Sequence, residues 1–564
     1  MNHPIIPIAV ALASRERKRQ APKGRRVDPQ ALADVQRLLG AAPRRADLLI
    51  EHLHKIQDHF KHLSSAHLAA LAQEMRLAQT EVYEVASFYH HFDIVKEGGD
   101  APAPLTVRVC DGLSCEMAGA KELLRKLPSL VGRDVRVIAA PCIGRCEQAP
   151  AAVVGQNPVP NATCEAVVDK VKTGAVTHQP EEYVDFARYQ AAGGYELIKH
   201  CISGDRDVEL VIKTMEDSGL RGLGGAGFPA GRKWRIVRAE AGPRLMAVNI
   251  DEGEPGTFKD RVYLERDPHR FLEGMLIAAW AVGIEKIYIY LRDEYHGCRE
   301  VLETELAKLR AAPPVKGMPE IELRRGAGAY ICGEESAMIE SIEGKRGMPR
   351  LRPPYVAQVG LFGRPTLEHN FETLYWVRDI LEKGAAWFSS HGRNGRKGLR
   401  SFSVSGRVKE PGVKLAPAGI TIQQLIDEFC GGMLDDHTFY AYLPGGASGG
   451  ILPATMNNIP LDFDTLQPYG CFIGSAAVMI LSDHDTATDA ARNMMRFFHH
   501  ESCGQCTPCR VGTAKAAHII DQLKWDLPLL ADLSLVMRDA SICGLGQAAP
   551  NPVDCVIKYF PHEL

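Results

Sequence analysis

Three cysteines in one short segment constrain this chain more than any other feature. Cys503, Cys506 and Cys509 are separated by two residues each, and Cys543 follows further along the chain. Thiolates at this spacing can each bind one corner of an iron–sulfur cubane, with the distant cysteine at the fourth corner. A structural zinc ion normally uses two separated cysteine pairs. The spacing therefore favours a [4Fe–4S] cluster over zinc or free thiols.

A second group of cysteines is spaced as two pairs: Cys110, Cys115, Cys142 and Cys146. Residues 105–109 and 135–139 have the pattern of β-strands, so each pair falls on a loop at a strand end. Two pairs of thiolates suit a [2Fe–2S] cluster with two ligands per iron, and zinc remains the alternative from spacing alone. The other cysteines show no ligand spacing and are interpreted as small core residues.

Composition excludes several function classes. The chain has 564 residues, 45% hydrophobic and 24% charged, which is an ordinary globular balance. A net charge of −3 does not indicate a nucleic-acid-binding protein. No apolar run approaches the roughly 18 residues that span a membrane. The apolar stretch 5–13 precedes its basic residues, the wrong order for an export signal. We therefore predict a cytoplasmic protein whose clustered cysteines bind metal and do not form disulfides.

The pattern along the chain predicts an α/β multidomain protein. The expected parts are a basic disordered arm (1–27), a helical domain (28–100), a small α/β domain (101–180), a larger α/β domain (190–399), a β-rich domain (400–482) and a helical domain (483–564). Within the larger domain, residues 245–249, 286–291 and 321–323 are predicted as strands. The histidines of the helix around 48–63 are interpreted as solvated, in preference to a metal site.

The first of several glycine-rich loops has the pattern G-x-G-x-x-G. It contains Gly222, Gly224, Gly225 and Gly227. A Rossmann site requires a strand before this pattern and a helix directly after it. Here residues 208–217 have a helical pattern, so an ordinary Rossmann site is rejected. Glycines still allow backbone amides to approach a phosphate or a flat ring, and Lys233 can add positive charge. A purely structural turn is the alternative.

Two further loops carry carboxylates. The strand 245–249 runs into a segment containing Asp251, Glu252 and Glu254. Ligands of open α/β sheets gather at the carboxyl ends of strands, where acidic groups suit ribose hydroxyls, a flavin edge or a nicotinamide. The segment 326–336 combines glycines with Glu334 and Glu335 before a predicted helix. An anion could bind at that helix start, or the carboxylates could simply complement its dipole.

These segments together resemble a known family. RGLGGAGFPAGRKW (221–234), NIDEGEPGTFKD (249–260), GAGAYICGEES (326–336) and ESCGQCTPCR (501–510) are similar to the NADH-binding flavoprotein subunit of respiratory complex I and its relatives. Residues 28–175 resemble the thioredoxin-like [2Fe–2S] subunit of the same complexes, here fused into one chain. The resemblance implies that 190–399 binds FMN, that 400–482 is a ubiquitin-like β-grasp domain and that 483–564 is the helical [4Fe–4S] domain.

The resemblance also implies cofactor contacts by position. FMN would be held by Gly222, Gly224, Lys233, Asn249, Asp251, Glu252, Gly333, Asn370 and Thr373, with Gly225 and Glu334 in the same loops. NADH would be contacted by Phe228, Glu254, Tyr330, Glu335 and Tyr355, of which the carboxylates Glu254 and Glu335 are the catalytic candidates. Arg352, another cofactor-binding candidate, stands where the family often has Lys, Tyr355 stands where it often has Phe, and His369 replaces a common Asn.

The whole chain most resembles the beta subunit of a tungsten- or molybdenum-containing, NAD-dependent formate dehydrogenase, in stretches such as 46–60 and 407–422. That resemblance implies a diaphorase that exchanges hydride between NAD(H) and FMN. Single electrons would pass through [4Fe–4S] to or from a catalytic alpha subunit, which carries a metal–pterin and further clusters. The alternatives are the same module of an NAD-reducing [NiFe] hydrogenase or of complex I, and a non-catalytic iron–sulfur carrier or redox sensor.

Overall fold

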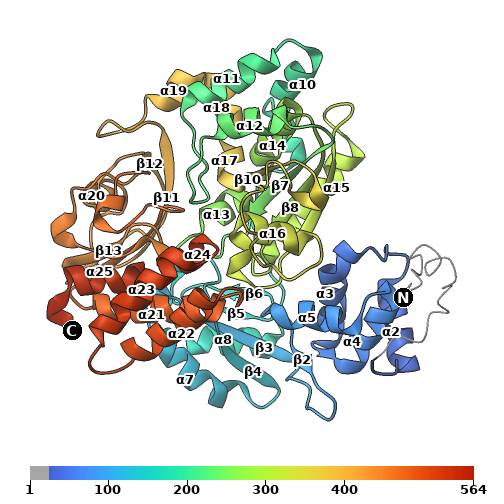
Figure 1. The fold of residues 1–564 in the computed structure, drawn as a ribbon, viewed down its shortest axis with the longest axis horizontal. Coiled ribbons are helices and arrows are strands. Elements are labelled where there is room, and N and C mark those ends of the chain that lie inside the picture. The colour runs from blue at the N-terminus through green and yellow to red at the C-terminus, as the bar shows by residue number, and fades with distance from the viewer. Residues whose placement is uncertain (1–23) are drawn as a thin grey trace, which may run out of the picture. The chain divides into compact units, whose positions relative to one another are not determined.

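The structure is a computed structural model that describes residues 24–564 (Figure 1). The predicted basic arm, residues 1–27, lies almost entirely outside the described residues. The chain forms two compact units. One contains the residues up to Ser87 together with Phe92–Ala101, and the other contains Phe88–His91 with Pro102–Leu564. Among the described residues, no helix combines the length and apolar character needed to cross a membrane.

The smaller unit is helical, as predicted. Its helices are α2 (Pro29–Leu39), α3 (Leu49–Phe60), α4 (Ser65–Met75) and α5 (Gln79–Phe88), with a short parallel pair β1 (Leu63–Ser64) and β2 (Ile94–Val95). Asp28 and Ser64 cap α2 and α4 through their side chains. The prediction of solvated histidines on α3 is wrong for two of them. His52 and His54 are only 2% and 3% exposed, because α3 is buried across a wide arc of its surface on both sides of Leu53.

The first part of the larger unit contains both predicted strands of the small α/β domain. β3 (Leu105–Cys110) pairs in parallel with β4 (Val135–Ala140), and β5 (Ala152–Val154) and β6 (Asn157–Val159) complete the sheet in the order β4-β3-β5-β6. The helices are α6 (Leu113–Met117), α7 (Ala120–Val131) and α8 (Cys164–Thr173). Val107 and Val109 are fully buried between this sheet and α7 and α8.

A four-stranded parallel sheet forms the centre of the next part. Its order is β10-β7-β8-β9, with β7 (Arg244–Ile250), β8 (Ile284–Leu291), β9 (Glu320–Arg325) and β10 (Thr366–Asn370). Around it lie α9 (Phe186–Ala191), α10 (Glu196–Ser203), α11 (Val208–Ser218), α12 (Ala230–Ala239), α13 (Lys259–Arg266), α14 (Pro268–Val282), α15 (His296–Ala311), α16 (Glu335–Ile342), α17 (Phe371–Tyr375), α18 (Val377–Lys383) and α19 (Ala385–Ser389). All strands of this sheet are parallel, so their carboxyl ends meet at one edge.

Helix α11, not a strand, precedes the glycine loop 222–227, which confirms the rejection of a Rossmann site. Strand β10 was not predicted.

The last parts are a mixed sheet and a helical bundle. The sheet has the order β12-β11-β15-β13-β14, built from β11 (Leu399–Gly406), β12 (Gly412–Pro417), β13 (Phe439–Leu443), β14 (Leu452–Pro453) and β15 (Ala477–Ser482), with α20 (Ile422–Phe429). β11 and β15 are parallel neighbours at its centre. The bundle contains α21 (Ala487–Glu501), α22 (Thr507–Ile520), α23 (Leu527–Ala540), α24 (Gly544–Ala548) and α25 (Asn551–Tyr559).

Candidate functional site

Polar side chains gather where β7 and β10 end side by side. This group, which contains Lys233, Asn249, Asp251 and Glu368, is called the seat. Asn249, near the end of β7, donates from Nδ2 to the Gly333 carbonyl at 2.9 Å and to Glu368 Oε1 at 3.3 Å. Lys233 of α12 donates from Nζ to the backbone oxygen of Glu368 at 3.0 Å and to its carboxylate at 3.2 Å. Four segments that are distant in the sequence therefore meet at one strand edge.

Asp251 provides the clearest sign that this seat binds something. Its Oδ2 is buried and has no hydrogen-bond partner among residues 24–564. Burial raises the pKa of this carboxyl well above its usual value. A Cβ on Gly333 would lie 3.2 Å from the Asp251 backbone oxygen, so the glycine keeps the adjoining space open. A buried acceptor beside a glycine-lined opening fits a ligand that brings hydrogen-bond donors, such as a flavin with its ribityl chain.

The glycine loop before α12 packs against the start of α17. Leu223 donates its backbone N–H to Thr373 Oγ1 at 2.9 Å. A Cβ on Gly224 would lie 2.9 Å from the Asn370 Cβ, so a larger residue would force the two segments apart. Asn370 in turn donates to Asp260 Oδ2 at 2.6 Å. The structure thus brings the predicted flavin residues Gly222, Gly224, Lys233, Asn249, Asp251, Gly333, Asn370 and Thr373 to one region.

Glu252 and Glu334, two further predicted flavin residues, accept hydrogen bonds from backbone N–H groups of the chain. The Glu252 carboxylate accepts the backbone N–H groups of Asp260 and Arg261, at 2.8 and 3.1 Å, and the Tyr295 hydroxyl at 2.8 Å. Glu334 caps α16 by accepting the N–H groups of Ser336 and Ala337. These contacts give both carboxylates the role of fixing loop geometry. For Glu334 this is the alternative named in the sequence analysis, in which a carboxylate at the helix start complements the helix dipole.

His369 is also enclosed by the protein. Trp234 Nε1 donates to its Nε2 at 2.8 Å, and burial lowers the pKa of His369 well below its usual value. The imidazole is therefore neutral and packed beneath the seat.

The predicted NADH residues include two exposed aromatic side chains and two carboxylates with partners of their own. Glu254 accepts hydrogen bonds from the Tyr330 hydroxyl and from Ser448. Phe228 and Tyr355 are 39% and 55% exposed, and the Arg232 guanidinium lies over the Phe228 ring, 5.8 Å from its centroid. Glu335 pairs with Arg352 at 3.0 Å, and Arg352 also contacts Glu334. Burial, followed by the charge of Glu368, raises the pKa of Glu335.

The four cysteines of the C-terminal group line a common cavity. Cys503, Cys506, Cys509 and Cys543 line it together with Ile331, Pro349, Ile542 and Leu545. Burial raises the pKa of Cys509 to about 11 and that of Cys543 to about 12. Thiolates there need a neighbouring cation, which iron supplies. The four converging cysteines therefore fit the predicted [4Fe–4S] cluster.

The four cysteines of the N-terminal group also converge. Cys110, Cys115, Cys142 and Cys146 are 1%, 1%, 2% and 6% exposed, and the Sγ atoms of Cys142 and Cys146 are 3.3 Å apart. Hydrogen bonding by Cys110 and Cys146 lowers the pKa of Cys142 well below its usual value. The prediction that each pair lies on a loop is wrong for the first pair, because Cys110 ends β3 and Cys115 lies in α6. Four buried, converging sulfurs fit the predicted [2Fe–2S] cluster.

Arginines of the larger α/β domain hold the loop of the second cysteine pair. Arg261 donates from Nε to the Gly144 carbonyl at 2.9 Å and contacts Glu147. Arg292 donates to the Cys142 carbonyl at 2.7 Å and to the Glu252 carbonyl at 2.5 Å. The loop that carries Cys142 is therefore fixed to the loop that carries Glu252 and Glu254.

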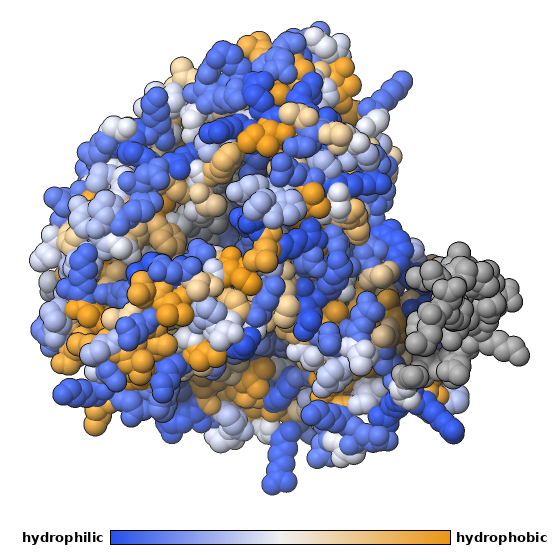
Figure 2. Space-filling model, in the orientation of Figure 1, coloured by the Kyte–Doolittle hydropathy of each residue, from blue (hydrophilic) through white to orange (hydrophobic). Residues whose placement is uncertain are grey.

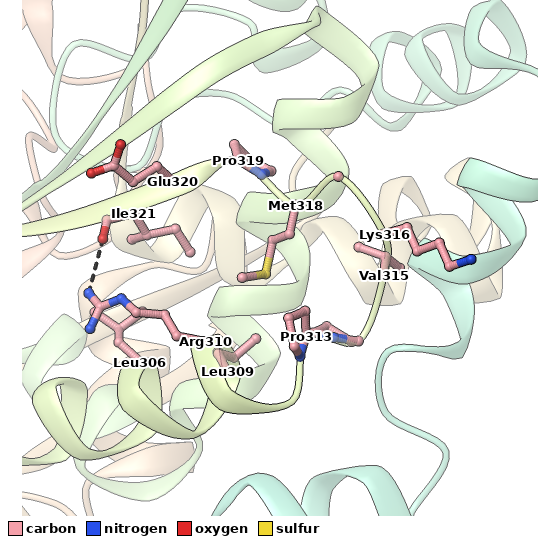
Figure 3. Close-up of a pocket in the computed structure, with 12 residues that line it drawn as sticks. Leu306, Leu309, Arg310, Pro313, Val315, Lys316, Met318, Pro319, Glu320 and Ile321 are labelled. Carbon is pink, nitrogen blue, oxygen red and sulfur yellow. Dashed lines mark hydrogen bonds between the residues drawn. The ribbon is translucent and has the colours of Figure 1, made fainter.

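Sequence reasoning missed Glu368, Lys259 and Ser448. Glu368 lies on the strand that was not predicted, and Ser448 comes from a loop 194 residues after its partner Glu254. A cavity between the end of α15 and the start of β9, drawn in Figure 3, was not predicted either. The residues that line it lie between 306 and 321 and include none of the predicted site residues. The dashed line in Figure 3 marks the hydrogen bond that Arg310 donates to the Ile321 carbonyl at 3.0 Å.

A glycine-lined seat beside a cysteine-lined cavity defines a flavin and iron–sulfur protein, and comparison with known proteins agrees. Residues 35–174 match the thioredoxin-like [2Fe–2S] ferredoxin family, residues 215–379 the Nuo51 FMN-binding domain, and residues 489–564 the NADH-ubiquinone oxidoreductase-F iron–sulfur binding region. The chain therefore has the domains that bind FMN and NADH, a [4Fe–4S] cluster and a [2Fe–2S] cluster.

Similar proteins identify the family. The F 2 component of the NADH-quinone oxidoreductase of Rhizobium meliloti (strain 1021) is 39% identical over 390 residues, which cover 67% of this chain and 92% of the relative. The mitochondrial NADH dehydrogenase [ubiquinone] flavoprotein 1 of Dictyostelium discoideum is 39% identical over 392 residues, covering 66% and 81%. The chain belongs to this family of NADH dehydrogenase flavoproteins.

A solved structure matches over nearly the full length. A chain in the crystal structure of an NAD⁺-reducing [NiFe]-hydrogenase in the H2-reduced state superposes with a TM-score of 0.81 and 33% identity. The match covers 92% of this chain and 93% of that chain.

Proposed function

We propose that this protein is the diaphorase subunit of a cytoplasmic, NAD-dependent formate dehydrogenase. In this role it exchanges hydride with NAD(H) and passes single electrons through its clusters. One short turn, residues Tyr330–Gly333, carries the proposal. Tyr330 contacts Glu254 on the NADH side, Gly333 adjoins Asp251 in the flavin seat, and Ile331 lines the cysteine cavity. The turn therefore touches all three candidate sites, which keeps the distances between bound cofactors short.

The chain's own residues would orient the reactants and exclude water. Bound FMN supplies the chemistry that couples two-electron hydride transfer to one-electron carriers. Asp251 and Asn249 would hold the flavin, while Phe228 and Tyr355 would stack against the dinucleotide. Glu254 would orient the nicotinamide ring. Arg352 forms ion pairs with the neighbouring carboxylates Glu334 and Glu335. No side chain needs to act as a general base, because hydride passes directly between the two cofactors.

We also propose the domain division predicted above, with boundaries near residues 100, 180, 400 and 483. The five-stranded sheet supports a ubiquitin-like β-grasp domain, because its parallel central pair β11 and β15 is flanked by antiparallel strands and α20 packs against β12.

The electron-transfer partner would dock beside the [4Fe–4S] cavity. Figure 2 shows apolar side chains gathered over the C-terminal helices. Their exposed members are Val511, Leu523, Leu527, Leu535 and Val536. Cys503, Cys506 and Cys543 are partly exposed near these helices. An apolar surface next to a partly exposed cluster suits a permanent partner with its own clusters. We propose that this partner is an alpha subunit that carries a tungsten– or molybdenum–pterin and oxidises formate or reduces CO2.

A second candidate has a specific observation in its favour. The full-length match to a chain of an NAD⁺-reducing hydrogenase fits a diaphorase in that class of enzyme equally well. The test is to co-purify the complex, assay NAD⁺ reduction with formate and with hydrogen separately, and measure its tungsten, molybdenum and nickel. Formate activity with tungsten or molybdenum supports the first candidate. Hydrogen activity with nickel and no formate activity would replace it with the second.

The diaphorase activity itself has a simpler test. The purified chain with FMN and both clusters should reduce an artificial dye with NADH, and Asp251→Asn should weaken FMN retention in gel filtration. A protein that binds FMN and iron but does not react with NADH would be a carrier or sensor, and the proposal would be wrong.

A further inference from the structure

We propose that Ser448 is a positioning residue of the NADH site, so that the five-stranded-sheet domain sets the orientation of Glu254. The inference rests on the proposed function and extends it to a domain outside the flavin-binding sheet. Ser448 donates to Glu254 Oε1 twice, from its backbone N–H at 2.8 Å and from its hydroxyl at 2.7 Å. The Tyr330 hydroxyl donates to the other carboxylate oxygen, Oε2.

The loop around Ser448 is shaped to bring its backbone against Glu254. It follows β13 and has the sequence GGASGG, residues 445–450. Gly446 has a φ of +75°, and a Cβ there would lie 2.6 Å from Glu254 Cγ. A Cβ on Gly445 would lie 2.1 Å from the Phe472 carbonyl. Side chains at either glycine would push the loop away, so the glycines permit the close approach.

The loop is also held from behind. The Gly446 N–H donates to the Ala477 carbonyl of β15 at 2.8 Å. Asn551, at the start of α25, donates from Nδ2 to the Ser448 carbonyl at 3.0 Å. The C-terminal bundle that carries the cysteine cavity therefore supports the residue that holds Glu254. Glu254 keeps one orientation because donors from two domains fix both of its oxygens.

The hydroxyl should matter more for function than for stability. Ser448 is half-buried, and its backbone donor remains when the side chain is removed. Loss of a hydrogen bond to a charged group changes an equilibrium or a rate by roughly tenfold or more. Burial raises the pKa of Glu254, whereas donation by Tyr330 and Ser448 lowers it. Loss of one donor therefore shifts the acidic limb of a pH profile to higher pH.

The test uses the full chain with FMN and clusters in place. Ser448→Ala should lower kcat/KM for NADH about tenfold and raise the Kd for NAD⁺, measured by equilibrium dialysis without turnover, by a similar factor. Ser448→Thr keeps the hydroxyl and should stay within about twofold of wild type. Thr465→Ala, which removes a hydroxyl of the same domain that bonds the Asp462 carbonyl, is the matched control.

A double-mutant cycle with Glu254→Ala, which removes the acceptor, decides the interpretation. If Ser448 acts through Glu254, Ser448→Ala should change the Kd for NAD⁺ by less than about twofold in the Glu254→Ala background. Equal effects in both backgrounds, or a Ser448→Ala protein that matches the Thr465→Ala control, would overturn the inference while the proposed function stands. A wild-type protein that does not oxidise NADH would instead remove the proposed function and this inference with it.

Discussion

The buried ion cluster beneath the flavin seat leads to the strongest stability prediction. Lys259 Nζ lies 2.7 Å from Asp260 Oδ1 and 3.1 Å from Glu372 Oε2, and these side chains are 1%, 2% and 1% exposed. Burial alone would lower the pKa of Lys259, but Asp260 and Glu372 raise it above its usual value. The Lys259→Met substitution keeps the side-chain volume and leaves two carboxylates buried together without a cation.

Removing one partner of a buried ion pair costs about 3–5 kcal/mol. At roughly 2–4 °C per kcal/mol for a domain of this size, the melting temperature should fall by roughly 6–20 °C. The matched control is Lys213→Met, because Lys213 pairs with Asp217 on an exposed helix face, where such a pair contributes about 0.5 kcal/mol or less. The FMN-loaded proteins are compared by calorimetry at one fixed scan rate.

The double variant Lys259→Met/Glu372→Gln should recover part of the lost stability, since it removes one of the unpaired charges. FMN affinity should also fall in Lys259→Met, because Asp260 accepts the hydrogen bond of Asn370 in the seat. A Lys259→Met protein that melts within about 2 °C of Lys213→Met would refute the assignment of a stabilising buried cluster.

Three further changes test separate parts of the structure. Cys543→Ser should lower the iron content by about four atoms per chain, whereas Cys201→Ser should leave it unchanged; equal iron in both would remove Cys543 from the ligand set. Gly224→Ala should weaken FMN binding about tenfold, because its Cβ would lie 2.9 Å from the Asn370 Cβ, and unchanged affinity would contradict this packing. Burial and a neighbouring carboxylate raise the pKa of Glu252 from 4.5 to about 7, so its contribution to stability declines as pH rises across that range. Glu252→Gln should flatten this decline between about pH 5 and 7, and an unchanged slope in melting temperature would argue against it.

The fold could be predicted where hydrophobic periodicity is strong. Strands β7 and β8 are nearly continuous apolar runs because helices cover the parallel sheet. Strand β10, with the sequence TLEHN, has only one apolar side chain, Leu367, in five positions, so it lacks the pattern of a buried strand and was missed. Its polar members Glu368 and Asn370 point into the site, so function disturbs the pattern that reveals a strand.

The convergence of the C-terminal cysteines could be predicted because their spacing is local. Cys503, Cys506 and Cys509 fall within seven residues, and their convergence with Cys543 needs only the turn between two helices. Roles that depend on loop geometry could not be assigned in this way. Adjacent carboxylates such as Glu334 and Glu335 have the same chemistry in sequence, yet Glu334 caps α16 whereas Glu335 follows it in the helix and pairs with Arg352.

Contacts between distant segments were beyond sequence reasoning altogether. Nothing near Ser448 in the chain indicates that it meets Glu254, because the glycines around it predict only a turn. The burial of His52 likewise depends on helix packing within the smaller unit, where Nε2 lies 3.0 Å from the Pro43 carbonyl.

Anaerobic titration of the purified chain with NADH tests the central claim most directly. The turn Tyr330–Gly333 places the NADH side, the flavin seat and the cysteine cavity together, so NADH should bleach the flavin absorbance near 450 nm. Low-temperature EPR should then show reduced iron–sulfur signals in the same sample, with one FMN and about six irons per chain. A chain that contains flavin and iron but shows no EPR signal after the flavin is bleached would contradict the account.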